Sequence, residues 1–215
     1  MALIQRDHWS YGDAWDYQLK RAELRQAGAC LDSLILTEHA PVYTLGRSAK
    51  ESELLTPNPQ TAAIPRVVSD RGGRITYHGP GQTMGYVIWD LRPQTRAVRA
   101  HVVRLEETIL QVLRELNVAA RRDDHGPGIW VGAAKIAAIG VRVSHGVTLH
   151  GFSLNRDPDL SHYAGIIPCG AVGGQVTSLA QLGIEITRPA LEQRLIHAFE
   201  VQFTAQCKPI EELLP

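Results

Sequence analysis

The sequence places Cys169 in the stretch GIIPCGAVGGQVTSL, residues 165–179, directly between a proline and a glycine. A cysteine that serves as a small hydrophobic residue usually lies inside a strand or a helix. A thiol at a Pro/Gly turn, just before a helix that the sequence predicts to start at Thr177 or Ser178, is accessible and ionises more readily. The pattern favours a nucleophilic thiol, with a structural cysteine as the alternative.

Lys135 is the second residue with a setting suited to chemistry. It is the lone charge in GAAKIAAIG, a strand of small apolar residues. The alanines beside it leave space above the sheet, where an ammonium group would be poorly solvated and would give up its proton more readily. Next to a thiol, such a lysine would favour the thiolate and could carry a proton. The alternative is an ordinary strand lysine that faces solvent.

The glycine loop DRGGRITYHGPGQ, residues 70–82, is the third feature. It is not a GxxxxGK[ST] phosphate loop, but a loop of this kind can offer several backbone N–H groups to an oxygen atom. A Gly/Pro hairpin is the alternative. His78 and His150 lie in glycine-flanked turns, and of the nine histidines these are the only two that we expect near a site. No HxH or HExxH pair occurs, so the sequence predicts no metal site.

Composition limits the class of protein. The 215 residues carry no net charge, which argues against general affinity for nucleic acid or membrane surfaces. The N-terminal residues read as neither a signal peptide nor a membrane span. The three cysteines are widely spaced and form no CxxC, so we expect a reduced, cytoplasmic protein in which Cys30 and Cys207 are structural.

Periodicity predicts helices over 12–27, 98–117 and 188–203, the first ended by Gly28. Strands are expected at 33–39, at 41–46, on both sides of the glycine loop within 66–92, and two or three times within 128–155. Residues 56–65 read as a loop. The elements do not alternate regularly as βαβ units. The sequence therefore predicts an α+β fold: a single domain, residues 1–215, with a mixed or antiparallel sheet and packed helices.

Taken in order, four segments resemble the octanoyltransferases of the lipoate pathway. They are TLGRSAKESELL, DRGGRITYHGPGQTMGYVIWDLR, GIWVGAAKIAAIGVRVSHGVTLHGFSLN and GIIPCGAVGGQVTSL, spread over 44–179. The resemblance implies the fold of biotin and lipoate protein ligase catalytic domains. It also implies an acyltransferase that moves an octanoyl group from octanoyl-acyl carrier protein to a lysine of a lipoyl domain, the first committed step of endogenous protein lipoylation in lipoate biosynthesis.

The resemblance also assigns roles by position. It places the acyl-thioester cysteine on Cys169 and the lysine that tunes it on Lys135. It implies no cofactor, no metal, and as acceptors the lipoyl domains of 2-oxoacid dehydrogenase E2 subunits and the glycine cleavage H protein. It places substrate contacts on Arg71, Gly72, Gly73, Arg74, Ile75, Thr76, Tyr77, His78, Ala138, Ile139, Gly140, Gly151, Phe152 and Ser153.

Two positions depart from the family pattern: Ala171 stands where a bulkier aliphatic residue is usual, and His145-Gly146 where a basic or aromatic pair is expected. Acyl carrier proteins are acidic, so a basic docking rim is also expected, with Arg47, Arg71, Arg74 and Arg142 as its members. Three alternatives stay open: an ATP-dependent lipoate or biotin protein ligase, an amidotransferase between lipoyl domains, and an inactive module that binds acyl domains.

Overall fold

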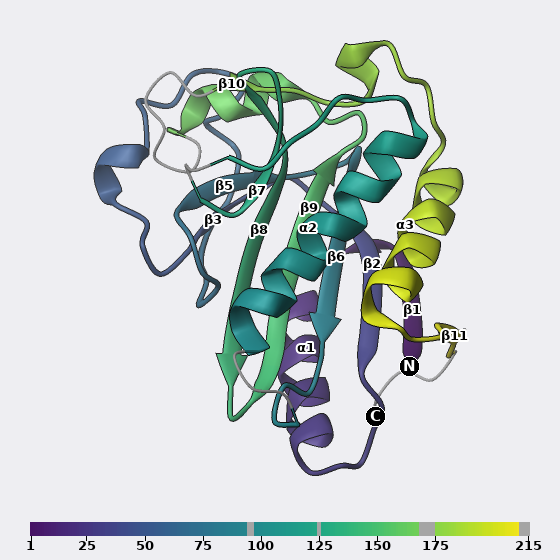
Figure 1. Cartoon of the computed structure of the whole chain (residues 1–215). Helices are drawn as coiled ribbons and strands as arrows, with labels where there is room; N and C mark the ends of the chain where they lie inside the picture. Colours follow the sequence, from purple (N-terminus) through teal and green to yellow (C-terminus); the bar gives the residue numbers. More distant parts are fainter. Residues whose placement is uncertain (94–96, 124–125, 168–174, 211–215) are drawn as a thin grey trace.

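The computed structural model describes residues 1–93, 97–123, 126–167 and 175–210 (Figure 1). Its helices in these ranges are α1 (Tyr11–Gln26), α2 (Ala97–Glu115) and α3 (Arg188–Phe203), with short 3-10 turns η1 (Glu51–Glu53), η2 (Leu160–Gly165) and η4 (Ala180–Leu182). Its strands are β1 (Ala2–Trp9), β2 (Ser33–His39), β3 (Val42–Leu45), β4 (Arg66–Val68), β5 (Ile75–His78), β6 (Gln82–Ile88), β7 (Gly128–Val131), β8 (Ala134–Ser144), β9 (Val147–Asn155), β10 (Gln175–Val176) and β11 (Lys208–Pro209).

The strands form two sheets. The larger has eight strands, in the order β10-β8-β9-β6-β2-β1-β11 with β7 also paired to β8. Its centre, from β8 through β9 and β6 to β2, is antiparallel, whereas β1 runs parallel to β2 and to β11, and β10 runs parallel to β8. The smaller sheet has the order β4-β3-β5. The predicted α+β class with a mixed sheet is confirmed.

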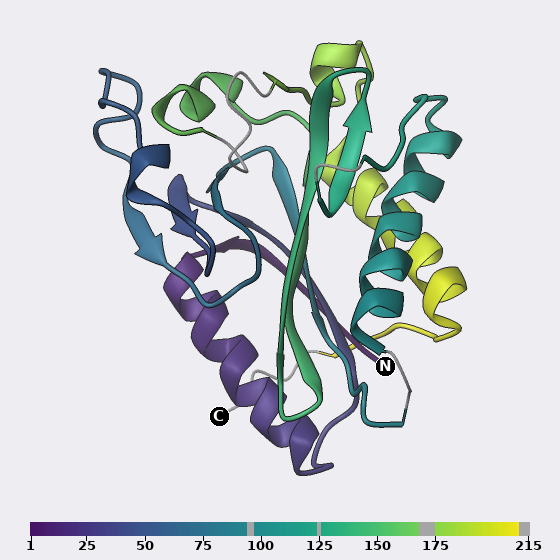
Figure 2. The same cartoon turned by 60° about the vertical axis from the view of Figure 1, so that its left-hand side comes forward.

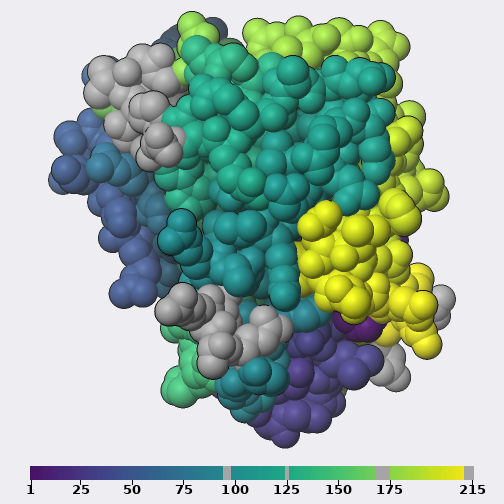
Figure 3. Space-filling view, viewed as in Figure 1, coloured from purple at the N-terminus to yellow at the C-terminus, as the bar shows by residue number. Residues whose placement is uncertain are grey.

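Helices cover the large sheet on both faces. Helices α2 and α3 lie on one face and α1 on the other (Figure 2). The pleat of β2 shows the division, because Leu34 and Leu36 pack with α2 and α3 whereas Ile35 packs with α1. Alternate residues of a strand point to opposite faces, so a strand buried on both sides is apolar throughout. Figure 3 shows the outer surface of α2 and α3, over the face that holds the largest apolar cluster.

The helix ends follow from local sequence. Ser10 caps α1, its hydroxyl accepting from the backbone N–H of Asp13 at 3.0 Å. Gly28 ends α1 in the left-handed region, with φ of +73°. Thr187 caps α3, and Pro189 lies in its first turn, where its missing N–H costs nothing. The three predicted helices are therefore confirmed, with ends shifted by no more than two residues.

Two expectations about elements need correction. The sequence predicted no strand at the N-terminus, yet β1 is central to the parallel part of the large sheet. The helix expected at Thr177 or Ser178 is wrong, because only the 3-10 turn Ala180–Leu182 follows. The Ser178 hydroxyl, two residues before that turn, accepts from the backbone N–H of Gln181 at 3.1 Å. Among the described residues, no helix is long and apolar enough to cross a membrane.

Candidate active site

A cavity of about 250 Å³ lies between the large sheet and the small one, on the α1 side. Strands β6, β8 and β9 form its floor, and β5 with the glycine loop forms its other wall. Its lining residues are Tyr11, Ser48, Arg71, Gly73, Arg74, Thr76, His78, Met84, Tyr86, Gly126, Pro127, Lys135, Ala138, Ile139, Gly140, His150, Gly151, Phe152 and Ser153. Natural ligand pockets start at about 300 Å³, so this cavity suits one small or chain-like group.

The floor of the cavity is made of cross-strand rows. Ser153 pairs with both Met84 and Ala138, and two residues further along the pleat Gly151 pairs with both Tyr86 and Gly140. Residues directly opposite one another share a face of the sheet, and so do residues two apart on one strand. The two glycines in this row let neighbouring backbone approach closely, since a Cβ atom on Gly151 would lie 2.2 Å from the Gly85 oxygen.

The small sheet contributes every second residue of its strand β5. Thr76 and His78 line the cavity, whereas Ile75 and Tyr77 point away and pack in a separate cluster with Tyr43. This alternation is the two-residue period of a strand. Of the predicted substrate segment 71–78, the structure therefore brings Arg71, Gly73, Arg74, Thr76 and His78 to the cavity, but not Gly72, Ile75 or Tyr77.

Glycines let the loop pack directly on β8. The backbone N–H of Gly72 donates to the carbonyl oxygen of Val141 at 3.1 Å. A Cβ atom on Gly140 would lie 2.7 Å from the Gly72 oxygen, and one on Gly72 would lie 2.9 Å from the Val141 oxygen. Both are closer than side-chain carbons approach backbone atoms. Gly72 therefore serves the fit of loop to sheet rather than the cavity wall.

Arg71 anchors the loop rather than forming a docking rim. Its guanidinium is buried and donates to the Thr44 hydroxyl at 2.8 Å, to the Thr44 carbonyl at 2.6 Å and to the Arg74 carbonyl at 2.7 Å. The expectation that Arg71 belongs to an exposed basic rim is therefore wrong. Arg74 is paired with buried Glu53 at 2.6 Å, and Arg142 is paired with Asp70. Of the four expected rim residues, Arg47 is the exposed one.

Lys135 lines the cavity from β8. Its Nζ lies 3.3 Å from the Pro127 carbonyl oxygen and 4.5 Å from the centre of the Trp130 ring, a cation–π contact. Its backbone oxygen accepts from the N–H of Thr177 at 3.0 Å, and β10 pairs with Ala134 and Lys135. The chain that follows the cysteine loop thus returns beside Lys135. Cys169 itself, and Ala171, lie outside the described residues.

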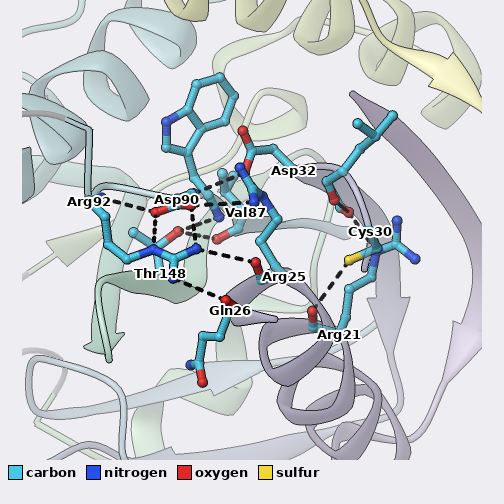
Figure 4. A network of polar contacts seen from close by, with 12 residues as sticks. Arg21, Arg25, Gln26, Cys30, Asp32, Val87, Asp90, Arg92 and Thr148 are labelled. Carbon is cyan, nitrogen blue, oxygen red and sulfur yellow. Dashed lines mark hydrogen bonds and ion pairs between the residues drawn. The ribbon is translucent and has the colours of Figure 1, made fainter. Parts of the chain in front are cut away.

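The other two cysteines lie away from the cavity. Cys30 follows α1, and its thiol donates to the Arg21 carbonyl at 3.6 Å (Figure 4). Burial raises the pKa of the Cys30 thiol. Cys207 packs beside the apolar cluster of α2 and α3, and burial together with the Glu200 charge raises its pKa to about 11. At neutral pH these two thiols are protonated and weakly nucleophilic.

The cavity face is rich in neutral, buried polar rings. Burial lowers the pKa of His39 and of His150, and burial with the Arg71 charge lowers the pKa of His78 to about 3. His150 Nε2 lies 2.8 Å from an oxygen of Asp70, and this hydrogen bond lowers the pKa of the Asp70 carboxyl. Burial raises the pKa of Tyr86. Both histidines expected near a site do line the cavity.

Several lining residues were missed by sequence reasoning. Met84 and Tyr86 alternate in β6 and could have been found from that spacing, since QTMGYVI follows the glycine loop directly. Tyr11, Ser48 and the pair Gly126-Pro127 lie far away in sequence and carry no local signal. The cavity-lining residues that the sequence did not predict are Tyr11, Ser48, Met84, Tyr86, Gly126 and Pro127.

One departure from the family pattern has a simple place in the fold. His145 and Gly146 form the two-residue turn between β8 and β9, with φ of +48° and +82°. Two positive φ angles are what a tight hairpin turn of this length requires. Neither residue lines the cavity. Within the described residues, no group of three or more His, Cys, Asp or Glu side chains could hold a metal ion.

Comparison with known proteins agrees with this architecture. The family model described as the lipoyl protein ligase A/B catalytic domain matches residues 10–200. An octanoyltransferase of Magnetococcus marinus is 56% identical over 207 residues, which cover 96% of this chain and 95% of that protein. A crystal structure of lipoate-protein ligase A bound with ATP matches with a TM-score of 0.78 at 17% identity, covering 98% of this chain and 89% of the other.

A biotin protein ligase from Aquifex aeolicus shares the fold more distantly, with a TM-score of 0.55 at 9% identity, covering 95% of this chain and 69% of the other. The expected biotin and lipoate ligase fold is thus confirmed. The family match over residues 10–200 and the 56% identity to the octanoyltransferase of Magnetococcus marinus together show the family of this chain. This chain belongs to the lipoyl protein ligase A/B catalytic-domain family, and within it to the octanoyltransferases, which are acyltransferases.

Proposed function

We propose that this enzyme transfers an octanoyl group from octanoyl-acyl carrier protein to a lysine of a lipoyl domain, through a thioester on Cys169. The observation that carries the proposal is the cavity, whose lining contains both Lys135 and apolar residues of the sheet such as Ile139 and Phe152. The names of the relatives support the octanoyl group. The position of Cys169 in PCG, followed by a chain that returns to Lys135, supports the nucleophile.

The first step is a thioester exchange. The Cys169 thiolate, stabilised by the charge of Lys135, attacks the donor carbonyl. A new C–S bond forms to Cys169, the C–S bond to pantetheine breaks, and the leaving thiolate takes its proton from Lys135. Because one thioester replaces another, the step is nearly thermoneutral and needs no ATP. Covalent catalysis of this kind divides one difficult transfer into two easier ones.

The second step forms the amide. The uncharged lysine amine of the lipoyl domain attacks the acyl-enzyme carbonyl, the C–N bond forms and the C–S bond to Cys169 breaks. Lys135, which gave its proton to pantetheine in the first step, takes the proton that the nitrogen loses, and this restores the charged lysine and the Cys169 thiolate of the starting state. An amide is more stable than a thioester, so this step drives the sequence. Backbone N–H groups of the glycine loop and beside Gly170 are candidates to stabilise the oxyanion.

The acyl tail would occupy the floor of the cavity. The proposed substrate contacts are 71–78, 138–140 and 151–153, of which the alternate β5 residues and the two glycines of the floor face the cavity. Along β8 the lining runs from Lys135 to Gly140, about 17 Å at 3.3 Å per residue. Each buried CH₂ contributes about 0.8 kcal/mol, so an octanoyl tail contributes about 5 kcal/mol at most. This favours medium chains over short ones.

The proposed partners follow from the reaction. The donor is octanoyl-acyl carrier protein, and the acceptors are lipoyl domains of 2-oxoacid dehydrogenase E2 subunits and the glycine cleavage H protein. No cofactor or metal takes part in either step. A cytoplasmic location is proposed with them, since two of the three thiols lie outside any disulfide and both are buried to some extent.

One experiment tests the proposal. The enzyme is incubated with octanoyl-acyl carrier protein without ATP, and intact mass with peptide mapping follows the label; a lipoyl domain is then added. We expect one octanoyl group on Cys169, which then moves to the lipoyl lysine. Octanoylation of the lipoyl domain only when octanoate and ATP are supplied would identify a ligase instead. A label on Cys30 or Cys207, or octanoyl-lipoyl domain as the only working donor, would also overturn the proposal.

A further inference from the structure

A chain of buried side-chain amides links His78 to the segment beside Lys135. His78 Nδ1 lies 2.6 Å from Gln82 Oε1, and Gln82 Nε2 lies 2.7 Å from Asn155 Oδ1. Asn155 Nδ2 donates to the Thr177 carbonyl at 2.8 Å. His78, Gln82 and Asn155 are all at most 4% exposed. The chain therefore joins β5, β6 and β9 to the residues that follow the cysteine loop.

The donor and acceptor of each hydrogen bond in this row of side chains can be assigned by starting from the Thr177 carbonyl, where the row ends. The Thr177 carbonyl can only accept, so the atom of Asn155 that faces it is the NH₂ group, and Asn155 Oδ1 must accept from Gln82. Gln82 then points its NH₂ at Asn155 and its oxygen at His78. An amide oxygen only accepts, so His78 carries its proton on Nδ1.

The other ring nitrogen is left for the cavity. His78 lines the cavity, and no described group hydrogen-bonds its Nε2, which in this tautomer has a lone pair and no proton. Tyr11 stacks on the ring at 6.2 Å between centres, and His39 lies at 6.5 Å. Burial, the Arg71 charge, and the nearby His39 and His150 all hold the pKa of His78 low, so the ring stays neutral at physiological pH.

We propose that Gln82 and Asn155 are positioning residues that fix His78 as a hydrogen-bond acceptor for the N–H of the attacking lysine amine. The inference rests on the proposed function. Of the groups that form or break a bond at the carbonyl carbon, the thiolate only accepts, as does the carbonyl oxygen itself, and the attacking amine is the one that carries N–H. A weakly basic acceptor orients the amine while Lys135 takes the proton. A neutral Nε2 cannot stabilise an oxyanion, which separates this role from that of the glycine loop.

The tautomer can be observed without any activity assay. In enzyme carrying ¹⁵N-labelled histidine, long-range ¹H–¹⁵N spectra separate protonated from unprotonated ring nitrogens, and the His78→Gln spectrum identifies the His78 signals. We expect a protonated Nδ1 and an unprotonated Nε2, unchanged between pH 8 and pH 5. A proton on Nε2, or an imidazolium at pH 7, would overturn the inference.

Gln82→Glu tests the link to the reaction. A carboxylate still accepts from Nδ1–H, but its charge favours a second proton on Nε2, which turns the acceptor into a donor. We expect the imidazolium signature at pH 7, a second half-reaction slowed at least tenfold, and acylation of Cys169 changed by less than about threefold. Thr83→Val is the matched control, since the Thr83 hydroxyl is buried on the same strand and has no hydrogen-bond partner among the described residues. It should change neither the spectrum nor the ratio of the two half-reactions.

The outcomes separate the two proposals. If no octanoyl group reaches Cys169 in the unmodified enzyme, the proposed function is wrong. The tautomer of His78 is tested independently, because it is measured from the NMR spectrum without any acyl transfer. If acylation and transfer proceed but Gln82→Glu transfers to the lipoyl domain as fast as the unmodified enzyme, with its His78 signals changed as expected, the acceptor role of His78 is wrong. His78→Gln should retain more of the second half-reaction than His78→Asn, because the longer amide places an oxygen near the Nε2 position.

Discussion

The two faces of the eight-stranded sheet bury different chemistry. The face under α2 and α3 holds one large apolar cluster, with fully buried Leu105, Ile109, Leu113 and Phe199. The face toward α1 and the small sheet holds a smaller apolar cluster and, next to it, a ring of buried histidine and tyrosine side chains around the cavity. Both faces are built from the same strands, with neighbouring residues pointing in opposite directions.

The difference shows how one sheet serves two purposes. Apolar burial is non-directional and roughly proportional to area, so the helix face stabilises the fold without constraining the site. Buried polar groups are tolerable only when hydrogen-bonded, so the cavity face is held by directed contacts such as those of Arg71 and Gln82. Changes on the first face should therefore alter stability, and changes on the second should alter catalysis.

The largest effect is expected at the cysteine that the sequence singles out. Cys169→Ser should lower octanoyl transfer by at least about a hundredfold, because an alcohol at neutral pH is a far weaker nucleophile than a thiolate. Transfer to a lipoyl domain, followed by mass spectrometry, measures this. Cys30→Ser and Cys207→Ser are the matched controls and should keep their activity, since both thiols are protonated at neutral pH. Loss of activity in either control would contradict the assignment.

On the helix face, Leu113→Ala should act on stability alone. Leu113 is fully buried in the apolar cluster. Removing its side chain leaves a cavity that costs about 3 kcal/mol of unfolding free energy. Urea unfolding measures the loss, and acyl transfer by the folded variant should stay within about twofold of the unmodified enzyme. A large loss of turnover in fully folded Leu113→Ala protein would contradict the expectation that the helix face affects stability and not catalysis.

His101 makes the helix face sensitive to acid. It packs at 5.5 Å on Phe203 in α3, no described group bonds either of its nitrogens, and burial lowers its pKa to about 4. The unfolded chain binds this proton near pH 6.5 and the folded chain only near 4, so stability is lost as pH falls across that window. In His101→Phe, the loss of unfolding free energy between pH 7.5 and 5 should be smaller by about 2 kcal/mol.

Urea unfolding at the two pH values tests this expectation. The other buried histidines, His78 among them, contribute to acid sensitivity equally in both proteins and cancel in the difference. An identical pH dependence for His101→Phe and the unmodified enzyme would show that His101 does not titrate as its burial requires.

On the cavity face, Ala138→Leu should shorten the acyl chain that fits. Ala138 lines the floor in the same row as Ser153. A larger side chain should lower kcat/KM for octanoyl donor about tenfold, a cost of about 1.4 kcal/mol, and affect butanoyl donor much less. Val143→Leu, on the same strand but 36% exposed and outside the cavity lining, is the control. Equal losses for both chain lengths would argue against an acyl site on this floor.

The smallest effect is expected at the surface. Arg47 is exposed next to Ser48, which lines the cavity. Arg47→Glu should raise the KM for octanoyl-acyl carrier protein about threefold at low salt, and the difference should shrink at high salt because exposed charges are screened. Arg99→Glu, exposed on α2, is the control for the opposite face. A KM that does not change with salt in any of the three proteins would show that charge attraction does not contribute to binding of the acyl carrier protein.

Local features of this protein can be predicted from its sequence. Apolar periodicity and the stop signal at Gly28 predicted the three helices, because these signals act on backbone groups within a few residues of themselves. The glycine loop, the setting of Lys135 and the two histidines His78 and His150 were also visible, and the structure brings them to one cavity. Each of these signals is carried by neighbouring residues.

The tertiary structure decided what depends on distant partners. Strand β1 has polar residues in its second half and no alternating pattern, and it forms by pairing with β2 and β11 from far along the chain. Arg71 looks like a surface cation in sequence, yet it is buried because Thr44 and the backbone of Arg74 supply its acceptors. The tautomer of His78 depends on Gln82, Asn155 and Thr177, which come together only when three strands and a loop are assembled. Hydrogen-bond direction is a property of such assembled networks, since each donor and acceptor is fixed by the next partner and not by its own sequence neighbours.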